Sequence, residues 1–289
     1  MSPIPKYEYS GRLRDEPRTL GFWRDIVSEL LSTFLFVTLS SMLRSSMSTG
    51  GELQLGIGIA FLWAAIGYGL GDFGGSHMNS AITLAMMVRG EIIFIKGVLY
   101  WIFQTGGALC AYYFVKALSK TDVGFSTTDS WWKVLMVEGC VTLVLCLTAL
   151  GTSNIPRKGY IILQSIPIGL AAGIGTMTAY SMTKACMSPT QALAYQLMQE
   201  IDGNNPNWSH HWYYWVGPMI GAVLAGIFYW IFDIIEKPGV PGVYNTWTYG
   251  DGKNGVKNSS RENLTRGARD DDYRGRAPIH HDHHGYNQY

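Results

Sequence analysis

Charged residues are scarce through most of this chain. Asp, Glu, Lys and Arg make up 15% of its 289 residues, the formal net charge is +1, and the charges crowd at the two ends. The four cysteines (Cys110, Cys140, Cys146 and Cys186) have no paired spacing and mostly lie in apolar runs, which argues against a disulfide framework. No catalytic constellation is present, so we expect no enzymatic activity, cofactor or bound metal, and no nucleic-acid partner.

Long apolar runs dominate the sequence instead. Six of them are long enough to cross a bilayer, which takes about 20 apolar residues per helix. The core of a large soluble helical protein could also contain such runs, but six in one short chain leave too few polar faces for a water-exposed surface. No small-residue cleavage motif follows the first run, so no removable signal peptide is expected. The runs cover approximately residues 25–43, 53–70, 93–118, 134–150, 160–180 and 212–235.

Lys and Arg in the short loops predict the orientation, because cytoplasmic loops carry an excess of both. With six crossings, the N-terminal segment, Arg89 with Lys96, Arg157 with Lys158, and the Arg-rich tail all lie on one side. Both termini are therefore predicted to be cytoplasmic, and the plasma membrane is the expected location. The expected organisation is a cytoplasmic N-terminal segment (1–22), a membrane domain (23–235, with halves of about 23–120 and 131–235) and a disordered cytoplasmic tail (236–289).

The chain repeats itself internally. Three matches occur in the same order in its two halves, and each half contains three spans, so the halves have opposite orientations in the membrane. Such an inverted repeat places a solute site near the bilayer midplane between the halves. The matches are Glu29 with Glu138 and Asn79 with Ser188, both at an offset of 109, and Tyr100-Trp101 with Tyr214-Trp215 at an offset of 114.

Two polar stretches, GGSHMNSAIT (74–83) and CMSPTQALA (186–194), are each followed by an apolar run too short to cross a bilayer. We expect two half-helices that enter from opposite faces, with Asn79 and Ser188 at their N-cap positions and Pro189 at the first helical position. Their electropositive N-termini then meet halfway through the membrane. Asn79 could donate its amide to a passing water while the two helix dipoles disfavour cations.

These motifs resemble those of the aquaporins, the major intrinsic protein family, over about residues 22–235. The usual SGAHxNPAVT is matched by residues 75–83, and the usual GxNPARS by residues 186–192. Trp215-Val216-Gly217-Pro218 and Gln104 also look like family positions. The resemblance implies an all-α membrane protein, with six transmembrane helices and two re-entrant half-helices in an inverted repeat. It also implies one pore in each subunit of a homotetramer.

Both signature triplets depart from the family's Asn-Pro-Ala. One reads Asn79-Ser80-Ala81 and the other Ser188-Pro189-Thr190. Gln191 stands where the family's filter has arginine, and by the resemblance the other filter positions are Ile59, Thr176 and Ala185. Loss of the arginine removes a barrier to cations, and Ile and Thr in place of an aromatic residue and His should widen the opening unless Met, Phe or Trp neighbours fill it.

The function expected from these features is passive transport of water, with other small uncharged solutes, through each subunit. Ala192 after Gln191 and the pair Tyr214-Trp215 favour the water branch of the family over the glycerol branch. Two alternatives remain open: a poorly conducting membrane protein with a structural or adhesive role, and a gated ion channel of the same fold.

Several polar residues are expected inside the membrane domain. Glu29 and Glu138 are interpreted as structural, each accepting backbone N–H groups of the re-entrant segment in its own half, with a proton relay as the alternative. Gln104 and His77 are expected to be buried alongside them.

Some smaller signals lie outside these motifs. Asn207 begins a glycosylation sequon in a predicted outer loop. Cys186 lies near the predicted filter and is the expected site of block by mercury. The histidines near residues 280–284 could bind a transition metal weakly or sense acid, although a solvated flexible tail is the simpler interpretation.

Overall fold

The computed structural model describes residues 17, 19–46, 51–74, 76–118, 130–153, 161–204 and 206–235. The chain divides into two units, residues 1–237 and 238–289, and the described residues all belong to the first. Most of the expected N-terminal segment (1–22), and the tail expected over 236–289 with its histidines, lie outside the described residues.

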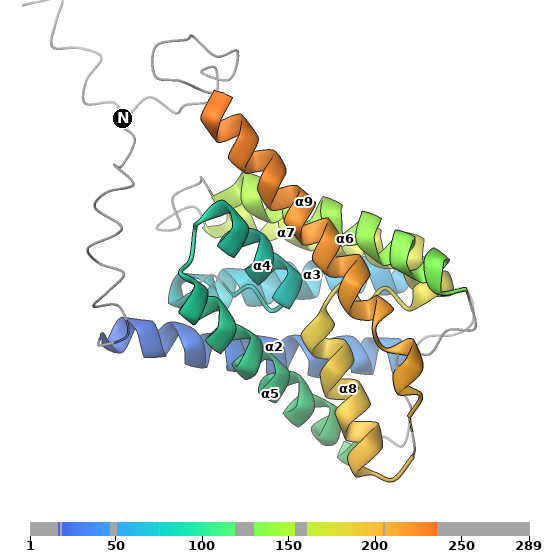
Figure 1. The fold of residues 1–289 in the computed structure, drawn as a ribbon. Coiled ribbons are helices and arrows are strands. Elements are labelled where there is room, and N and C mark those ends of the chain that lie inside the picture. The colour runs from blue at the N-terminus through green and yellow to red at the C-terminus, as the bar shows by residue number, and fades with distance from the viewer. Residues whose placement is uncertain are drawn as a thin grey trace, which may run out of the picture. The chain divides into compact units, whose positions relative to one another are not determined.

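Six long helices and two short ones make up the described part, and every regular element in it is helical (Figure 1). The short helices are α4 (Ser80–Arg89) and α8 (Pro189–Ile201), and single 3-10 turns occur at Gly71–Phe73 and Trp208–His210. The long helices fall where the apolar runs predicted spans. They are α2 (Leu20–Ser45), α3 (Glu52–Leu70), α5 (Phe94–Leu118), α6 (Trp131–Ser153), α7 (Ile161–Thr183) and α9 (Tyr213–Ile235).

The outer faces of the long helices are apolar. Every one of them exposes large hydrophobic side chains, such as Leu31 of α2, Phe61 of α3 and Leu170 of α7. Among the described residues, α2, α3, α5, α6 and α9 are long and apolar enough to cross a membrane. Helix α7 has 23 residues and a similar length. Exposed apolar helix faces of bilayer length are what lipid requires, since only internally hydrogen-bonded backbone can span it.

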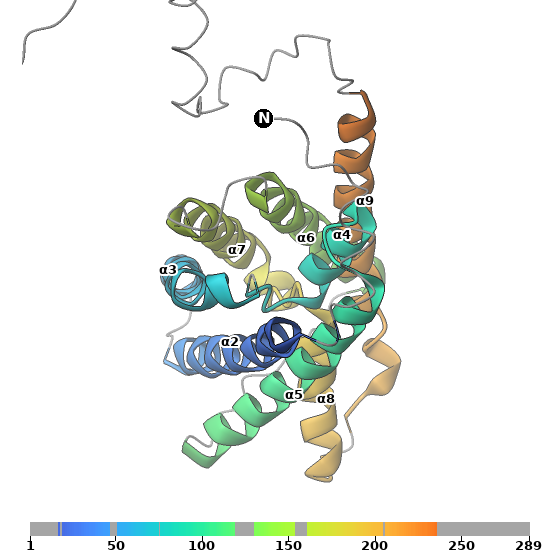
Figure 2. The same cartoon turned by 90° about the vertical axis from the view of Figure 1, so that its left-hand side faces the viewer.

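The packing of the helices follows the repeat. Within the first half α2 packs on α5, within the second half α6 packs on α9, and α3 packs on α7 where the halves meet. Each short helix packs chiefly on the last long helix of the other half, α4 on α9 and α8 on α5. The long helices thus surround the two loops that lead into α4 and α8, as Figure 2 shows.

Two glycines in matching positions allow the close helix contacts. A Cβ on Gly107 of α5 would lie 2.5 Å from the Leu30 carbonyl oxygen of α2, and a Cβ on Gly221 of α9 would clash with the Gly139 carbonyl of α6. Small residues at such crossings let helix backbones approach in the membrane. The sequence prediction of six spans, two half-helices and an inverted repeat is confirmed.

Candidate functional site

Helix α4 begins in the interior of the protein, and an asparagine caps its first turn. The side-chain oxygen of Asn79 accepts hydrogen bonds from the backbone N–H groups of Ala81 (2.7 Å) and Ile82 (3.4 Å). Asn79 is only 2% exposed, so these bonds satisfy buried backbone donors at the start of the helix. This geometry is the N-cap expected from the sequence.

Helix α8 begins differently, although Ser188 does occupy the N-cap position expected from the sequence. The Ser188 side chain, however, makes no capping hydrogen bond. Its hydroxyl lies 3.4 Å from that of Thr190. The backbone N–H of Thr190 instead donates to the hydroxyl of Ser80, 3.1 Å away at the start of the opposite half-helix. Ser80, where the family triplet has proline, therefore caps α8 from the other half of the chain.

Two side-chain amides also cross between the halves. Asn79 Nδ2 donates to the Met187 carbonyl oxygen at 2.9 Å, and Gln191 Nε2 donates to the Met78 carbonyl oxygen at 3.1 Å. Met78 and Met187 are equivalent positions of the repeat, 109 residues apart. The amide of Gln191 thus makes, for the second half, the type of bond that Asn79 makes for the first.

The loops before the two half-helices have matching backbone strain. Ser76 and Met78 in the first loop have φ of 45° and 52°, and Ala185 and Met187 at the equivalent places have φ of 49° and 52°. Left-handed conformation is costly for residues with a Cβ and persists only when surrounding contacts impose it.

Each strained loop is held by a buried glutamate of its own half. The carboxylate of Glu29 accepts the N–H groups of His77 (2.6 Å) and Met78 (3.0 Å), and that of Glu138 accepts those of Cys186 (3.0 Å) and Met187 (2.7 Å). Because the N–H groups turn toward the carboxylates, the carbonyls of Met78 and Met187 face the junction, where they accept the crossing amides.

The side chains that donate hydrogen bonds to the two carboxylates differ between the halves. In the first half Gln104 Nε2 donates to Glu29 Oε2 at 2.9 Å and to the Thr83 hydroxyl at 3.1 Å. His77 Nδ1 also lies 3.1 Å from that hydroxyl. In the second half the Thr183 hydroxyl donates to Glu138 Oε1 at 2.6 Å. The repeat therefore keeps the carboxylates and the backbone bonds but not the supporting side chains.

A small cavity of about 20 Å³ lies on one side of the junction. All four predicted filter residues line it, and so does Asn79. A space of this size holds about one water molecule. Phe36 and Trp63, whose rings pack edge to face at 4.9 Å, also line the cavity and occupy part of the width around Ile59 and Thr176. The residues that line it are Phe36, Arg44, Ile59, Trp63, Asn79, Leu145, Ala172, Thr176, Ala185, Cys186, Met187 and Gln191.

A second cavity, of about 30 Å³, shares Trp63 with the first. It is lined by residues of the first re-entrant loop, Ser76 and His77, and by Ile82 of α4. Its other polar groups are Thr152, Ser153 and Gln164. Polar side chains thus line both cavities.

Three features of this site were missed from the sequence. Arg44 of α2 lines the first cavity although the filter arginine is absent, Ser80 caps the opposite helix, and Gln191 bridges to the other loop. A lone Arg at the end of an apolar run was the available signal for Arg44, but nothing local shows what it faces.

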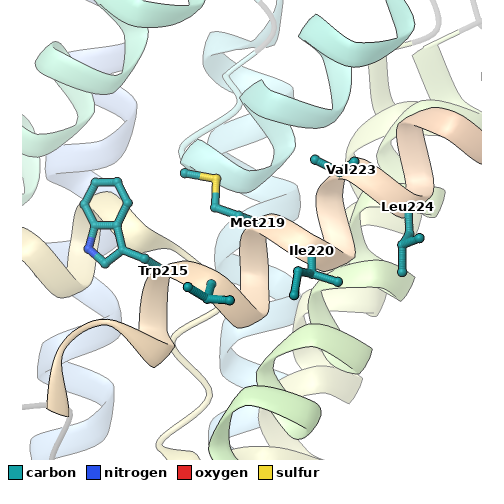
Figure 3. Close-up of a pocket in the computed structure, with 6 residues that line it drawn as sticks. Trp215, Met219, Ile220, Val223 and Leu224 are labelled. Atoms are coloured by element: carbon teal, nitrogen blue, oxygen red, sulfur yellow. The ribbon is translucent and has the colours of Figure 1, made fainter.

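Two other regions lie away from these two cavities. Asn207 of the predicted sequon is exposed between α8 and α9, and its side-chain oxygen accepts the Ser209 N–H at 3.1 Å. A hollow of about 360 Å³ on the outside of α9 is lined by apolar residues and Trp215 (Figure 3). Its position on one helix face separates it from the two cavities.

Comparison with known proteins identifies relatives over most of the chain. The sequence model described as "Major intrinsic protein" matches residues 16–229. Probable aquaporin TIP3-2 of Oryza sativa subsp. japonica is 30% identical over 243 residues, covering 80% of this chain and 89% of that protein. Aquaporin-4 of Mus musculus is 29% identical over 226 residues, covering 73% and 68%.

A solved structure shows the same fold. The aquaglyceroporin from Plasmodium falciparum superposes with a TM-score of 0.63 at 19% sequence identity, covering 72% of this chain and 95% of that one. At this identity the likeness concerns the fold alone.

Proposed function

The chain belongs to the major intrinsic protein family, and we propose that it forms a passive pore for water, open also to other small uncharged solutes, in each of its subunits. Members of this family are channels and not enzymes, so the chain is an integral membrane channel.

The observation that carries the proposal is the junction of the two half-helices between two small polar cavities. Asn79 and Ser188 are 2% and 0% exposed, and hydrogen bonds link the starts of α4 and α8. Cavities of about 20 and 30 Å³ suit water in single file. One N–H of the Asn79 amide is used by the Met187 carbonyl, which leaves the second to orient a passing water.

The junction disfavours cations for an electrostatic reason. Each helix N-terminus carries a partial charge of about +0.5, and α4 and α8 bring two such ends to one place. Ile59, Thr176, Ala185 and Gln191, which line the first cavity, are proposed as the selectivity filter. A filter of this composition contacts a solute through one amide, one hydroxyl and an apolar wall.

The buried glutamates are proposed to be structural. Both oxygens of Glu29 and of Glu138 accept backbone N–H groups, and neither residue lines a cavity described above. A carboxylate held this way stabilises the strained loops by accepting their backbone N–H groups. A proton relay would instead make transport depend steeply on pH.

We further propose a homotetramer surrounded by lipid in the plasma membrane, with both termini in the cytoplasm. The support is the family resemblance and the distribution of Lys and Arg among the loops. In that orientation Asn207 lies outside, where its sequon is available for glycosylation. Mass of the detergent-solubilised complex, with and without glycosidase, tests assembly and modification together.

The decisive experiment is a flux measurement on the purified full-length protein in liposomes. Stopped-flow light scattering with water, glycerol and urea gradients should show water permeability well above that of protein-free vesicles, with the same rate from pH 6 to pH 8. Cation flux should stay at the background level.

Each alternative has its own outcome in that experiment. No flux of any solute by correctly assembled protein would favour a structural or adhesive role. Ion currents comparable to those of a cation channel would favour the gated ion pathway. Water flux that rises steeply with pH would revive the proton-relay interpretation of the glutamates.

A further inference from the structure

The filter position has no arginine, yet a positively charged side chain lines the first cavity. Gln191 turns its amide to the Met78 carbonyl oxygen, 3.1 Å away across the junction. Arg44, in the last turn of α2, lines the same cavity as Gln191, Ile59 and Thr176. A positive charge therefore reaches the filter from a different helix.

Two contacts position Arg44 at the cavity. Its Nη1 donates to the Lys184 carbonyl oxygen at 2.7 Å, and its guanidinium carbon lies 5.2 Å from the centre of the Tyr180 ring. Both partners belong to the end of α7 and the loop that leads into α8, so the guanidinium is attached to the segment that carries Ala185. A guanidinium has five N–H donors in a planar fork, which lets one group bind a carbonyl and still face a cavity.

The other charged groups near this cavity do not take its place. Lys184 Nζ lies 4.9 Å from the centre of the same Tyr180 ring, but Lys184 does not line the cavity. Glu138, the buried acid of this half, accepts Cys186 N, Met187 N and the Thr183 hydroxyl. These three donors offset the negative charge of Glu138, which does not itself line the cavity.

We propose that Arg44 is the residue that excludes cations from this pore, in place of the arginine expected at position 191. This inference rests on the proposed function, since it presumes that the cavity is the conducting route. A fixed unit charge acts strongly on an ion in a site that holds about one water, because little solvent screens it there. The half-helix ends add to the same barrier.

The test compares charge removal at Arg44 with charge removal at Lys184. Liposomes with full-length protein are loaded with a sodium- or pH-sensitive dye, and cation and water fluxes are measured on the same preparation. Arg44→Gln and Arg44→Met are expected to raise cation flux at least about tenfold, equivalent to about 1.4 kcal/mol of barrier. Arg44→Lys retains the charge and should remain cation-tight, as should Lys184→Gln.

A second-site variant places the charge where the family has it. Gln191→Arg in the Arg44→Gln background should return cation flux toward the wild-type level. This rescue also shows that the single variant leaks because it lacks a charge and not because it is misfolded. The amount of tetramer in detergent provides a separate check on folding.

The possible results separate the two proposals. If the Arg44→Gln and Arg44→Met variants leaked no more cations than the wild type, the proposed role of Arg44 in excluding cations would be overturned. Lys184→Gln that leaks as much as they do would overturn it too. Absence of water flux in the wild type would contradict the proposed function, whereas the cation readout judges Arg44 by itself.

Discussion

Ser80 and Ser188 show how two altered triplets can still form one junction. The Ser188 hydroxyl makes no capping hydrogen bond, whereas the Ser80 hydroxyl accepts the Thr190 N–H. Proline at position 80 would have no hydroxyl to offer. The two departures from the family pattern therefore compensate for each other across the repeat.

Ser80→Ala should destabilise the protein, whereas Ser188→Ala should not. Loss of the Ser80 hydroxyl leaves the buried Thr190 N–H without its acceptor, which costs about 1–3 kcal/mol. The Ser188 hydroxyl has only a 3.4 Å neighbour, so its removal should have little effect. Melting temperatures of the two variants in detergent check this, and equal losses would contradict the assigned cap.

The inverted repeat also appears in the way that the long helices pair. The α2–α5 and α6–α9 contacts are equivalent, and each depends on a glycine facing a backbone carbonyl of its partner helix. Because backbone cannot move aside as a flexible side chain can, a single methyl group at either glycine must shift a whole helix. The tightness of these crossings holds the half-helices in place.

Gly107→Ala should therefore lower stability, with Gly106→Ala as its control. The added Cβ at 107 would lie 2.5 Å from the Leu30 carbonyl oxygen, whereas a Cβ at 106 meets nothing within 4 Å. At 106 alanine should be neutral or stabilising by up to about 1 kcal/mol through helix propensity. A melting temperature several degrees lower for the 107 variant alone is expected, and similar values for both would refute the close contact.

For the molecule as a whole, the proposed conducting route is narrow at both cavities. Both cavities lie along it, and the side chains that line it come from both halves. An obstruction at a single point should then stop all flux through a subunit. Cys186 offers such a point, because it lines the first cavity and is 5% exposed.

Mercuric ion should block water flux by bonding to the Cys186 sulfur with release of the thiol proton. The Cys186→Ser variant should keep its flux in mercury, whereas Cys146→Ser should be blocked like the wild type. Cys146 is buried but lines neither cavity. Stopped-flow swelling before and after mercury, followed by a thiol reductant, measures the effect. A Cys186→Ser protein that is still blocked would place the reactive thiol elsewhere.

Much of the architecture could be predicted from the sequence. Apolar length determines a span locally, because a helix satisfies its own backbone in lipid. The offset of 109 residues relates Glu29 to Glu138 and Asn79 to Ser188, so the inverted halves and the two half-helices were also predictable. The four filter positions, inferred by resemblance, do line one cavity.

What only the tertiary structure decided is which side chains complete that cavity and junction. Arg44 bonds to a carbonyl 140 residues away, Ser80 to an N–H 110 residues away, and Gln191 to a carbonyl 113 residues away. Such pairings depend on the angles at which packed helices deliver their ends, which no local spacing records. The sequence by itself determined two polar helix starts meeting inside a membrane, and the contact of Arg44, at the end of α2, with the loop before α8 determined which charged side chain lines the first cavity.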